Sequence, residues 1–430
     1  MAMATREVRH PQGSRTRQAR SLALQLFLAL FVLRLFADAK FIPGGLSSAL
    51  NLAILYGAIA GGFLVSTQRN ARTKRITIPV FVAFVVTWFL IGVIEVGFAQ
   101  PLTSAALRFL ALIGMAVLAR VAVREIGPSR FAVLLVWGAF PAVLILAVAT
   151  LTHSPLFFAV STGRAFGTFN HTNSAASFIA IYILLLAYLL LRQPRWRYAL
   201  ALVVSVVGVV GTLSMGGLIA LLSGLILLLL LSGAGVGVKV AALGGVVVSV
   251  VAVLASGALS TRLEELQTTV SFDDANSRSI TNSLDWRFYN WRRLLDIWEE
   301  RPIFGIGLGR ADFDAQPIGK QPHSEFVRLL VETGLIGSAV IFLLVATAVV
   351  LLVRDREVDP WGKALAVSTL ATLLVNAIAS NTTSYAPTMM LCIATWAVGS
   401  NTLKDGPGAL PRGKARRAMA QYRSGLLTNG

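Results

Sequence analysis

The chain has 430 residues, of which 56% are hydrophobic and 13% are charged, and its net charge is +18. A soluble domain normally carries about 25% charged residues, so a chain this apolar lacks the polar surface to cover its own core. Composition therefore excludes a soluble globular protein and indicates an all-α integral membrane protein. The single cysteine, Cys392, excludes an intramolecular disulfide, and the four histidines lack the spacing of a metal site.

A membrane-spanning helix needs roughly 20 mostly apolar residues. The sequence predicts twelve such segments, at 21–38, 44–66, 77–98, 102–122, 131–152, 173–191, 197–213, 216–232, 236–258, 334–353, 362–380 and 386–402. The first stretch ends in Ala37-Asp38-Ala39, which resembles a signal-peptidase site. Arg34 within that stretch favours an uncleaved first helix.

Basic residues predict the orientation of these segments. They gather in both terminal arms, 1–20 and 403–430, and in the connections that follow even-numbered segments. The basic residues in those connections are Arg69, Arg72, Lys74, Arg75, Arg124, Arg130, Arg192, Arg195, Arg197, Lys239, Arg354, Arg356 and Lys363. The positive-inside rule then places both termini in the cytoplasm. Attraction to anionic lipid headgroups explains the net charge better than nucleic-acid binding does.

The resulting organisation is a basic arm at 1–20, nine spans within 21–258, a large loop at 259–333, three spans within 334–402 and a basic tail at 403–430. Helix parity places the large loop outside the cytoplasm. Within this loop, 283–301 is predicted to form an amphipathic helix at the membrane interface, capped by Ser283. Its apolar face carries Trp286, Tyr289, Leu294, Ile297 and Trp298.

Two groups of arginines fall on the predicted outer side. Arg164 stands in a loop with no other Lys or Arg, and a guanidinium is suited to phosphate oxygens. It would equally suit a contact with a lipid headgroup or a helix end. Arg287 and Trp291 share one face of the amphipathic helix, which fits a site for a lipid phosphate and a sugar ring, or simply an interfacial helix that touches headgroups.

His323 follows Pro322 at the predicted start of a helix on the same side. The positive end of a helix dipole disfavours the imidazolium cation. A neutral imidazole there would suit a general base, and the alternative is a loop histidine without a role.

A glycine-rich run and a pair of charged residues in apolar segments are predicted to have structural roles. The run from Gly305 to Gly309 is predicted to make a tight turn, because its spacing is not that of a dinucleotide fingerprint. Glu95 and Arg108 lie in neighbouring apolar segments, and intramembrane charges are functional candidates by default. We expect them to form an ion pair with each other.

Together these segments resemble the O-antigen ligase and polymerase superfamily of bacterial membrane proteins, over about residues 160–340. The residues that carry the resemblance are, in chain order, Arg164, Gly167, Phe169 and Asn173, then Arg287 and Trp291, then Pro302, Gly305, Gly307 and Gly309, and finally His323, Glu332, Gly334 and Gly337. Two positions depart from the pattern. Met215 stands where relatives often have Arg in a Ser-Arg-Gly turn, and Ser324 stands where many have Asn after the histidine.

The resemblance implies a glycosyltransferase of cell-envelope polysaccharide biosynthesis on the outer face of the bacterial cytoplasmic membrane. The donor would be a glycan on a polyprenyl pyrophosphate such as undecaprenyl pyrophosphate. The acceptor would be a hydroxyl group of a glycan, a lipid-linked sugar or a protein. No metal, nucleotide or other cofactor is expected.

The resemblance also implies roles for individual residues. Arg164 and Arg287 would bind the pyrophosphate, and His323 would orient or deprotonate the acceptor hydroxyl. Three further residues would support them, namely Asn173, Arg292 and Glu332. The resemblance does not choose between a ligase and a polymerase.

Two other classes remain as alternatives. A multi-pass transporter of a small solute or of a lipid-linked substrate would suit twelve spans with both ends inside. It should show repeated halves and polar or broken helices at the midplane, and no convincing internal repeat is present. In a non-catalytic membrane scaffold, the large loop would bind a partner and alanine at His323 would have little effect.

Overall fold

The computed structural model describes residues 12–67, 77–255, 260–269, 282–312 and 322–403, together with 257, 271, 272 and 280. Most of the basic arm at 1–20, the basic connection from Arg69 to Arg75 and the tail beyond Leu403 lie outside the described residues.

The described chain is almost entirely helical, which confirms the all-α class. The long apolar helices are α1 (Gln12–Phe36), α2 (Gly44–Thr67), α3 (Thr77–Val96), α4 (Gln100–Ile126), α5 (Pro128–Thr152), α6 (Thr172–Arg192), α7 (Trp196–Gly211), α8 (Met215–Leu231), α9 (Val236–Ala255), α12 (Glu325–Arg354), α13 (Pro360–Ala377) and α14 (Ala386–Asn401). Helices α10 (Ser260–Thr268) and α11 (Ser283–Glu300) lie in the predicted large loop.

Short elements complete the chain. Strands β1 (Phe158–Ala159) and β2 (Arg164–Ala165) form an antiparallel hairpin in which Ala159 pairs with Arg164. Single 3-10 turns are η2 (Val160–Thr162), η3 (Arg310–Asp312) and η4 (Thr382–Ser384).

Length and composition let six of the described helices cross a bilayer. These are Gly44–Ser66, Pro79–Val96, Gln100–Ile126, Pro128–Thr152, Thr172–Arg192 and Glu325–Arg354. Four other apolar helices, in α1, α7, α8 and α9, are shorter. The multi-pass membrane architecture is therefore confirmed, whereas the number of twelve spans stays a prediction.

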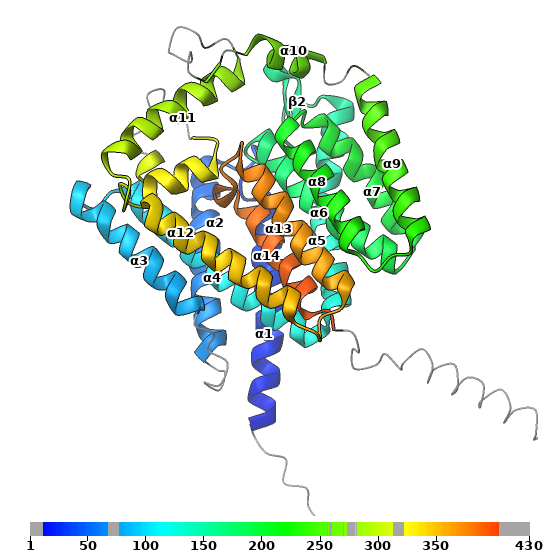
Figure 1. The fold of residues 1–430 in the computed structure, drawn as a ribbon. Helices are drawn as coiled ribbons and strands as arrows, with labels where there is room; N and C mark the ends of the chain where they lie inside the picture. Colours follow the sequence, from blue (N-terminus) through cyan, green and yellow to red (C-terminus); the bar gives the residue numbers. More distant parts are fainter. Residues whose placement is uncertain are drawn as a thin grey trace, which may run out of the picture.

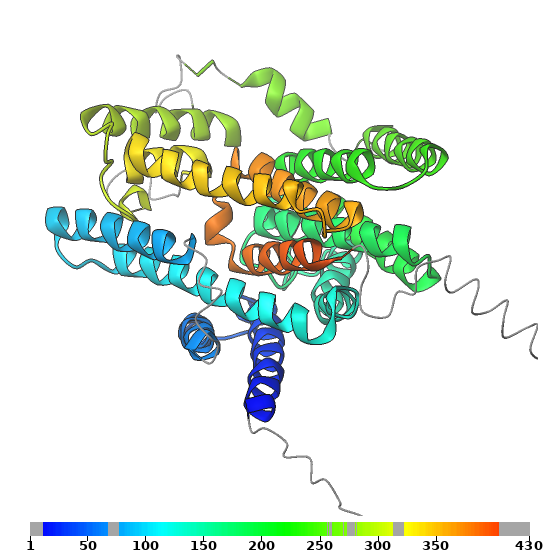
Figure 2. The ribbon, with the colours of Figure 1, turned by 60° about the horizontal axis from the view of Figure 1, so that its bottom comes forward.

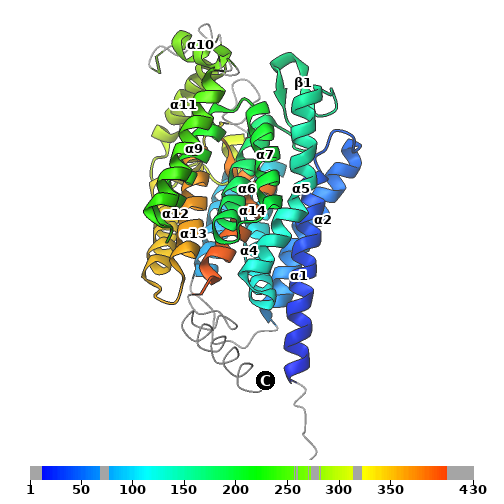
Figure 3. The ribbon, with the colours of Figure 1, turned by 90° about the vertical axis from the view of Figure 1, so that its right-hand side faces the viewer.

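The helices form a bundle whose two ends differ (Figures 1 and 3). The start of α1 and the end of α14 lie toward one end, and β2, α10 and α11 lie at the other. Helix α6 runs through the centre, where it packs against α5, α7, α8, α13 and α14. Helices α11 and α12 run side by side along one edge, with α3 and α4 next to them (Figure 2).

Close packing in the centre depends on small residues. A Cβ on Gly224 in α8 would lie 2.0 Å from the Thr372 hydroxyl of α13. A Cβ on Gly362 would lie 2.4 Å from the carbonyl of Gly399 in α14. Membrane helices use such small residues to bring their backbones together, because dispersion contacts must replace the hydrophobic effect in lipid.

The tight turn predicted from Gly305 to Gly309 is present and holds the loop against the bundle. All three of its glycines have positive φ, at 70°, 100° and 82°. The amides of Ile306 and Gly307 donate to the carbonyls of Val331 and Glu332 in α12. Leu335 and Ile336 return two bonds to Pro302 and Ile303. This exchange satisfies the α12 backbone where the helix is kinked at Gly334, which has φ 62°.

Helix α12 begins at Glu325, well before the predicted span at 334–353. Its first turns carry the charged residues Glu325, Arg328 and Glu332 among apolar side chains, and the kink at Gly334 falls where the uninterrupted apolar stretch begins. The predicted cap of α11 was also one residue late. Asn282 rather than Ser283 caps the helix, in a capping box with Asp285.

The expected ion pair between Glu95 and Arg108 is wrong. Glu95 lies near the end of α3 and pairs with Arg301 and Arg310 of the loop, with 2.7 Å between Arg310 Nη1 and Glu95 Oε2. Arg108 in α4 instead donates to the Ser384 hydroxyl at 2.5 Å. The polar loop therefore supplies the counter-charges of Glu95, and a neutral hydroxyl between α13 and α14 binds Arg108.

Replacing Gly307 by alanine is expected to destabilise the protein strongly, because the new Cβ would lie 2.4 Å from the Gly92 backbone of α3. Gly97→Ala is the matched control. Gly97 also has positive φ, at 73°, but no atom lies within 4 Å of its added Cβ. The control should cost only the ~1–2 kcal/mol of a left-handed backbone. Thermal unfolding in detergent measures both variants, and equal losses would contradict the packing role of Gly307.

Candidate functional site

Arg164 is held in place by three elements at one end of the bundle. It extends from β2, and its Nε donates to the Thr212 carbonyl at 2.7 Å, next to the turn between α7 and α8. Its Nη2 donates to Asn173 Oδ1 at 2.9 Å in the first turn of α6. The Ser214 hydroxyl donates to the same Oδ1 at 3.1 Å. The structure thus brings together Arg164 and its predicted supporting residue Asn173.

His171 was not singled out from the sequence, yet it lies in the same cluster. It is the N-cap of α6, and its Nδ1 accepts the amide of Asn173 at 3.1 Å. Partial burial and the charges of Arg164 and Arg287 lower the pKa of His171 to about 4. The imidazole is therefore neutral near pH 7.

Arg287 reaches the same cluster from α11. The buried face of this helix includes Trp286, Asn290 and Leu294, and Arg287 is half-buried beside it. The charge of Arg287 acts on the pKa of both His171 and Tyr385, and so does the charge of Arg164. Two arginines distant in the sequence therefore face one site.

His323 lies between this site and α11. Its backbone is left-handed, with φ 52°, and it immediately precedes Ser324, the N-cap of α12. Its ring centroid lies 6.0 Å from that of His171 and 5.2 Å from that of Trp286, which meets it edge-on. The Trp291 indole donates to the Pro322 carbonyl at 2.7 Å. Helix α11 therefore positions His323 through two tryptophans.

The other two predicted supporting residues lie elsewhere. Arg292 is exposed, and at 3.6 residues per turn it points about 140° away from Arg287 around α11. Glu332 is buried at the kink of α12, where its carbonyl accepts the Gly307 amide. Glu332 therefore lies at the turn, and the bond to Gly307 is made by its backbone.

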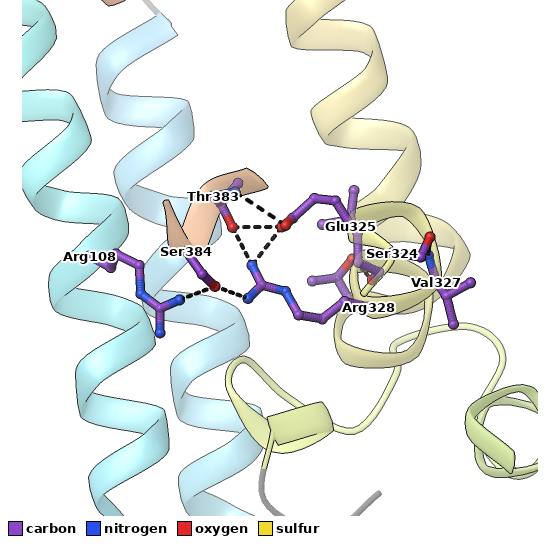
Figure 4. Close-up of polar contacts among 9 residues, drawn as sticks. Arg108, Ser324, Glu325, Val327, Arg328, Thr383 and Ser384 are labelled. Carbon is purple, nitrogen blue, oxygen red and sulfur yellow. Dashed lines mark hydrogen bonds and ion pairs between the residues drawn. The ribbon is translucent and has the colours of Figure 1, made fainter. Parts of the chain in front are cut away.

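A second polar cluster, which the sequence analysis missed, lies beside the site (Figure 4). Arg328 of α12 is buried and donates to Glu325 at 2.5 Å, to Ser384 at 3.0 Å and to Thr383. The Thr383 hydroxyl donates to Glu325 at 2.6 Å. Arg108 of α4 donates to the same Ser384 hydroxyl. The Ser384 oxygen thus joins two guanidinium groups from α4 and α12.

Tyr385 links this second cluster to the first. Burial raises the pKa of Tyr385 to about 12, against the opposing charges of Arg287 and Arg164. The phenol is therefore protonated and able to donate a hydrogen bond at neutral pH. Its segment between α13 and α14 showed only hydropathy in the sequence. Arg328 falls within the predicted outer loop at 259–333, where an arginine is ordinary and indicates no site.

No group of three His, Cys, Asp or Glu side chains suited to a metal ion occurs in the described part of the chain. The site instead combines guanidinium, imidazole and hydroxyl groups. Such a set can bind an anion through Arg164 and Arg287 and can exchange a proton through imidazole.

The lowered pKa of His171 predicts a pH-dependent stability. Between about pH 6.5 and 4 the His171 side chain binds a proton in the unfolded chain but not in the folded protein. The contribution of neutral His171 to the free energy of unfolding is therefore fully present above pH 6.5 and is lost as the pH falls through 4. His171→Asn should keep the cap, because Asn accepts the same amide, but it does not titrate. The thermal midpoint in detergent should therefore fall less between pH 7 and 4 in the variant. Parallel curves for the two proteins would refute the assignment.

The Arg328 cluster predicts a strong coupling in stability. Arg328→Met should cost about 3–5 kcal/mol, because it leaves the Glu325 carboxylate without its buried counter-charge. The double variant Glu325→Gln/Arg328→Met removes both charges and should recover part of this loss. A double-mutant cycle on thermal unfolding in detergent tests this, and additive losses would show that the two side chains are not coupled.

A family model described as O-antigen ligase matches residues 200–342. The matched segment contains Arg287, His323 and the turn at Ser214, whereas Arg164 and Tyr385 flank it. Neither a curated protein nor a solved structure matches the chain. The match over residues 200–342 confirms the resemblance of this chain to the O-antigen ligase and polymerase superfamily, which its motifs predict.

Proposed function

We propose that the protein is a membrane glycosyltransferase of cell-envelope polysaccharide biosynthesis. It transfers a glycan from a polyprenyl-pyrophosphate donor to a hydroxyl acceptor on the outer face of the bacterial cytoplasmic membrane. The observation that supports this most is the convergence of Arg164 and Arg287 on His171, beside His323, within a chain that carries an O-antigen ligase segment.

The two arginines bind the pyrophosphate of the donor. As the bond between the anomeric carbon and the phosphate oxygen breaks, the electron pair stays on the pyrophosphate and its negative charge increases. Fixed cations beside the leaving group stabilise this charge without reorganising. Arg164 meets this requirement, since Thr212 and Asn173 hold its guanidinium in one orientation.

His323 serves the acceptor. The acceptor hydroxyl oxygen forms the new bond to the anomeric carbon, and its proton passes to the imidazole. Trp286 and Trp291 fix the ring and the backbone before it, so the base keeps its place when the large substrate enters. Neutral His171 and the protonated Tyr385 phenol supply further hydrogen bonds at the same site without adding negative charge.

The reaction needs no metal ion in this scheme, because guanidinium groups supply the positive charge that phosphoryl leaving groups require. Free energy comes from the activated donor itself. The acceptor is a glycan, a lipid-linked sugar or a protein.

His323→Ala, Arg164→Ala and Arg287→Ala should each remove glycan transfer while leaving a folded protein, because each removes one of the proposed reacting or charge-stabilising groups. Losses of about 10²–10⁴-fold are expected for groups of this kind. The measurement is transfer from a purified lipid-pyrophosphate donor by the protein in membranes. The product also separates a polymerase, which lengthens the chain, from a ligase, which moves a finished chain.

Arg293→Ala is the matched control, since Arg293 lies on the same helix as Arg287 but is exposed. It should retain transfer, and circular dichroism and detergent gel filtration should show all four variants folded. Normal transfer by all three site variants would overturn the proposal. Substrate uptake into vesicles by those variants would favour a transporter instead.

A further inference from the structure

A second candidate site lies at the opposite end of the bundle. Helix α6 begins beside His171 at the site above and ends at Arg192, about 30 Å away at 1.5 Å per residue. At that far end there is a cavity of about 470 Å³. The side chains that line it include Arg130, Arg195, Arg197, Tyr198, Val133 and Leu134.

Two helices begin at this cavity. Helix α5 starts at Pro128 after Gly127, and helix α7 starts at Trp196 after Arg195. Neither of these N-cap residues has a side-chain acceptor for the first amides, and Pro128 itself has no amide hydrogen. The first amides of a helix have no partner within the helix, and the dipole makes this end positive. An anion is the ligand that suits two such ends together.

The charged residues at the cavity also favour an anionic ligand. Three arginines line it, and no Asp or Glu does. In the described part of the chain, none of the three takes part in an ion pair. The charged side chains that line the cavity are therefore all positive.

Two buried polar atoms lie next to the cavity. Tyr198 lines the cavity and is fully buried, at 0% exposure, and its hydroxyl has no hydrogen-bond partner among the described residues. The same is true of the buried Nε of Arg197, whose guanidinium lies over the Tyr198 ring at 5.3 Å. Both atoms have almost no accessible surface and lie behind the cavity wall, so the wall must move before a bound anion can accept a hydrogen bond from either of them.

The surroundings select the kind of anion. The wall of the cavity is largely apolar, and Leu134 is 40% exposed on the outer surface of α5. Trp196 at the start of α7 is 79% exposed, as expected of an aromatic residue at a membrane interface. This end also carries the basic connections, which the sequence predicts to face the anionic cytoplasmic leaflet.

We propose that this cavity binds the phosphodiester headgroup of an anionic phospholipid. The arginines and the two helix ends hold the phosphate, and an acyl chain lies along Val133 and Leu134. This site is independent of the proposed glycosyl transfer.

Native mass spectrometry of the full-length protein in detergent tests the proposal. The probes are phosphatidylglycerol and phosphatidylcholine with identical acyl chains. The pocket variant is Arg130→Gln/Arg195→Gln, and the control is Arg354→Gln/Arg356→Gln. The control removes the same charge from exposed arginines at the same end of the bundle. Loss of two arginines should weaken phosphatidylglycerol binding about 30-fold in the pocket variant and only a few-fold in the control.

Three results would overturn the proposal. Equal weakening in both variants would mean general attraction to positive charge rather than a site. Both lipids carry the same phosphate, and only phosphatidylcholine balances it with a choline cation. Equal binding of the two lipids by the unmodified protein would therefore mean that the net negative charge of the headgroup is not recognised. Displacement of phosphatidylglycerol by millimolar inorganic phosphate would mean a free anion is the ligand. Unchanged thermal midpoints in both variants show that the comparison is made on folded protein.

Discussion

Like-charged guanidinium groups lie close together at one end of the apolar bundle, and their mutual repulsion costs free energy that the rest of the fold must offset. Arg164 and Arg287 carry like charges and act on the same histidine and tyrosine. Like charges in a partly desolvated place repel, so the chain must fix each one through other groups. Arg164 is fixed by a carbonyl and an amide oxygen, and Arg287 by its place on a capped helix. A site of this kind favours an anion as its ligand.

The Gly305–Gly309 turn lets the loop meet this requirement. It bonds to α12 at the kink, and the Leu308 amide donates to the Trp88 carbonyl of α3. The Trp88 indole in turn donates to the carbonyls of Phe304 and Thr333. Helices α11 and α12 are thereby tied to the bundle at one point. The tryptophans of α11 can then set the position of His323 against His171, which belongs to a different part of the chain.

Sequence reasoning succeeded where a feature was local. Hydropathy located the apolar helices, and the glycine spacing located the turn. The motifs located Arg164, Arg287 and His323, and helix parity placed them at one end. Contacts between segments that are distant in the sequence could not be predicted. The partners of Glu95 and Arg108 lie more than two hundred residues away along the chain, in the loop and in η4, and only the fold reveals them. Ser384 and Tyr385 carried no periodic or motif signal at all.

The two ends of the molecule hold arginines in different ways, and the difference matches what each end is proposed to do. Arg164 already has protein partners that fix its orientation, which suits a cation that must stabilise charge as it develops in a reaction. Arg130 and Arg195 are exposed and take part in no ion pair in the described part of the chain. Side chains of that kind lose conformational freedom only when a ligand arrives, so they contribute affinity rather than catalysis. A basic chain can therefore carry two anion sites with separate purposes.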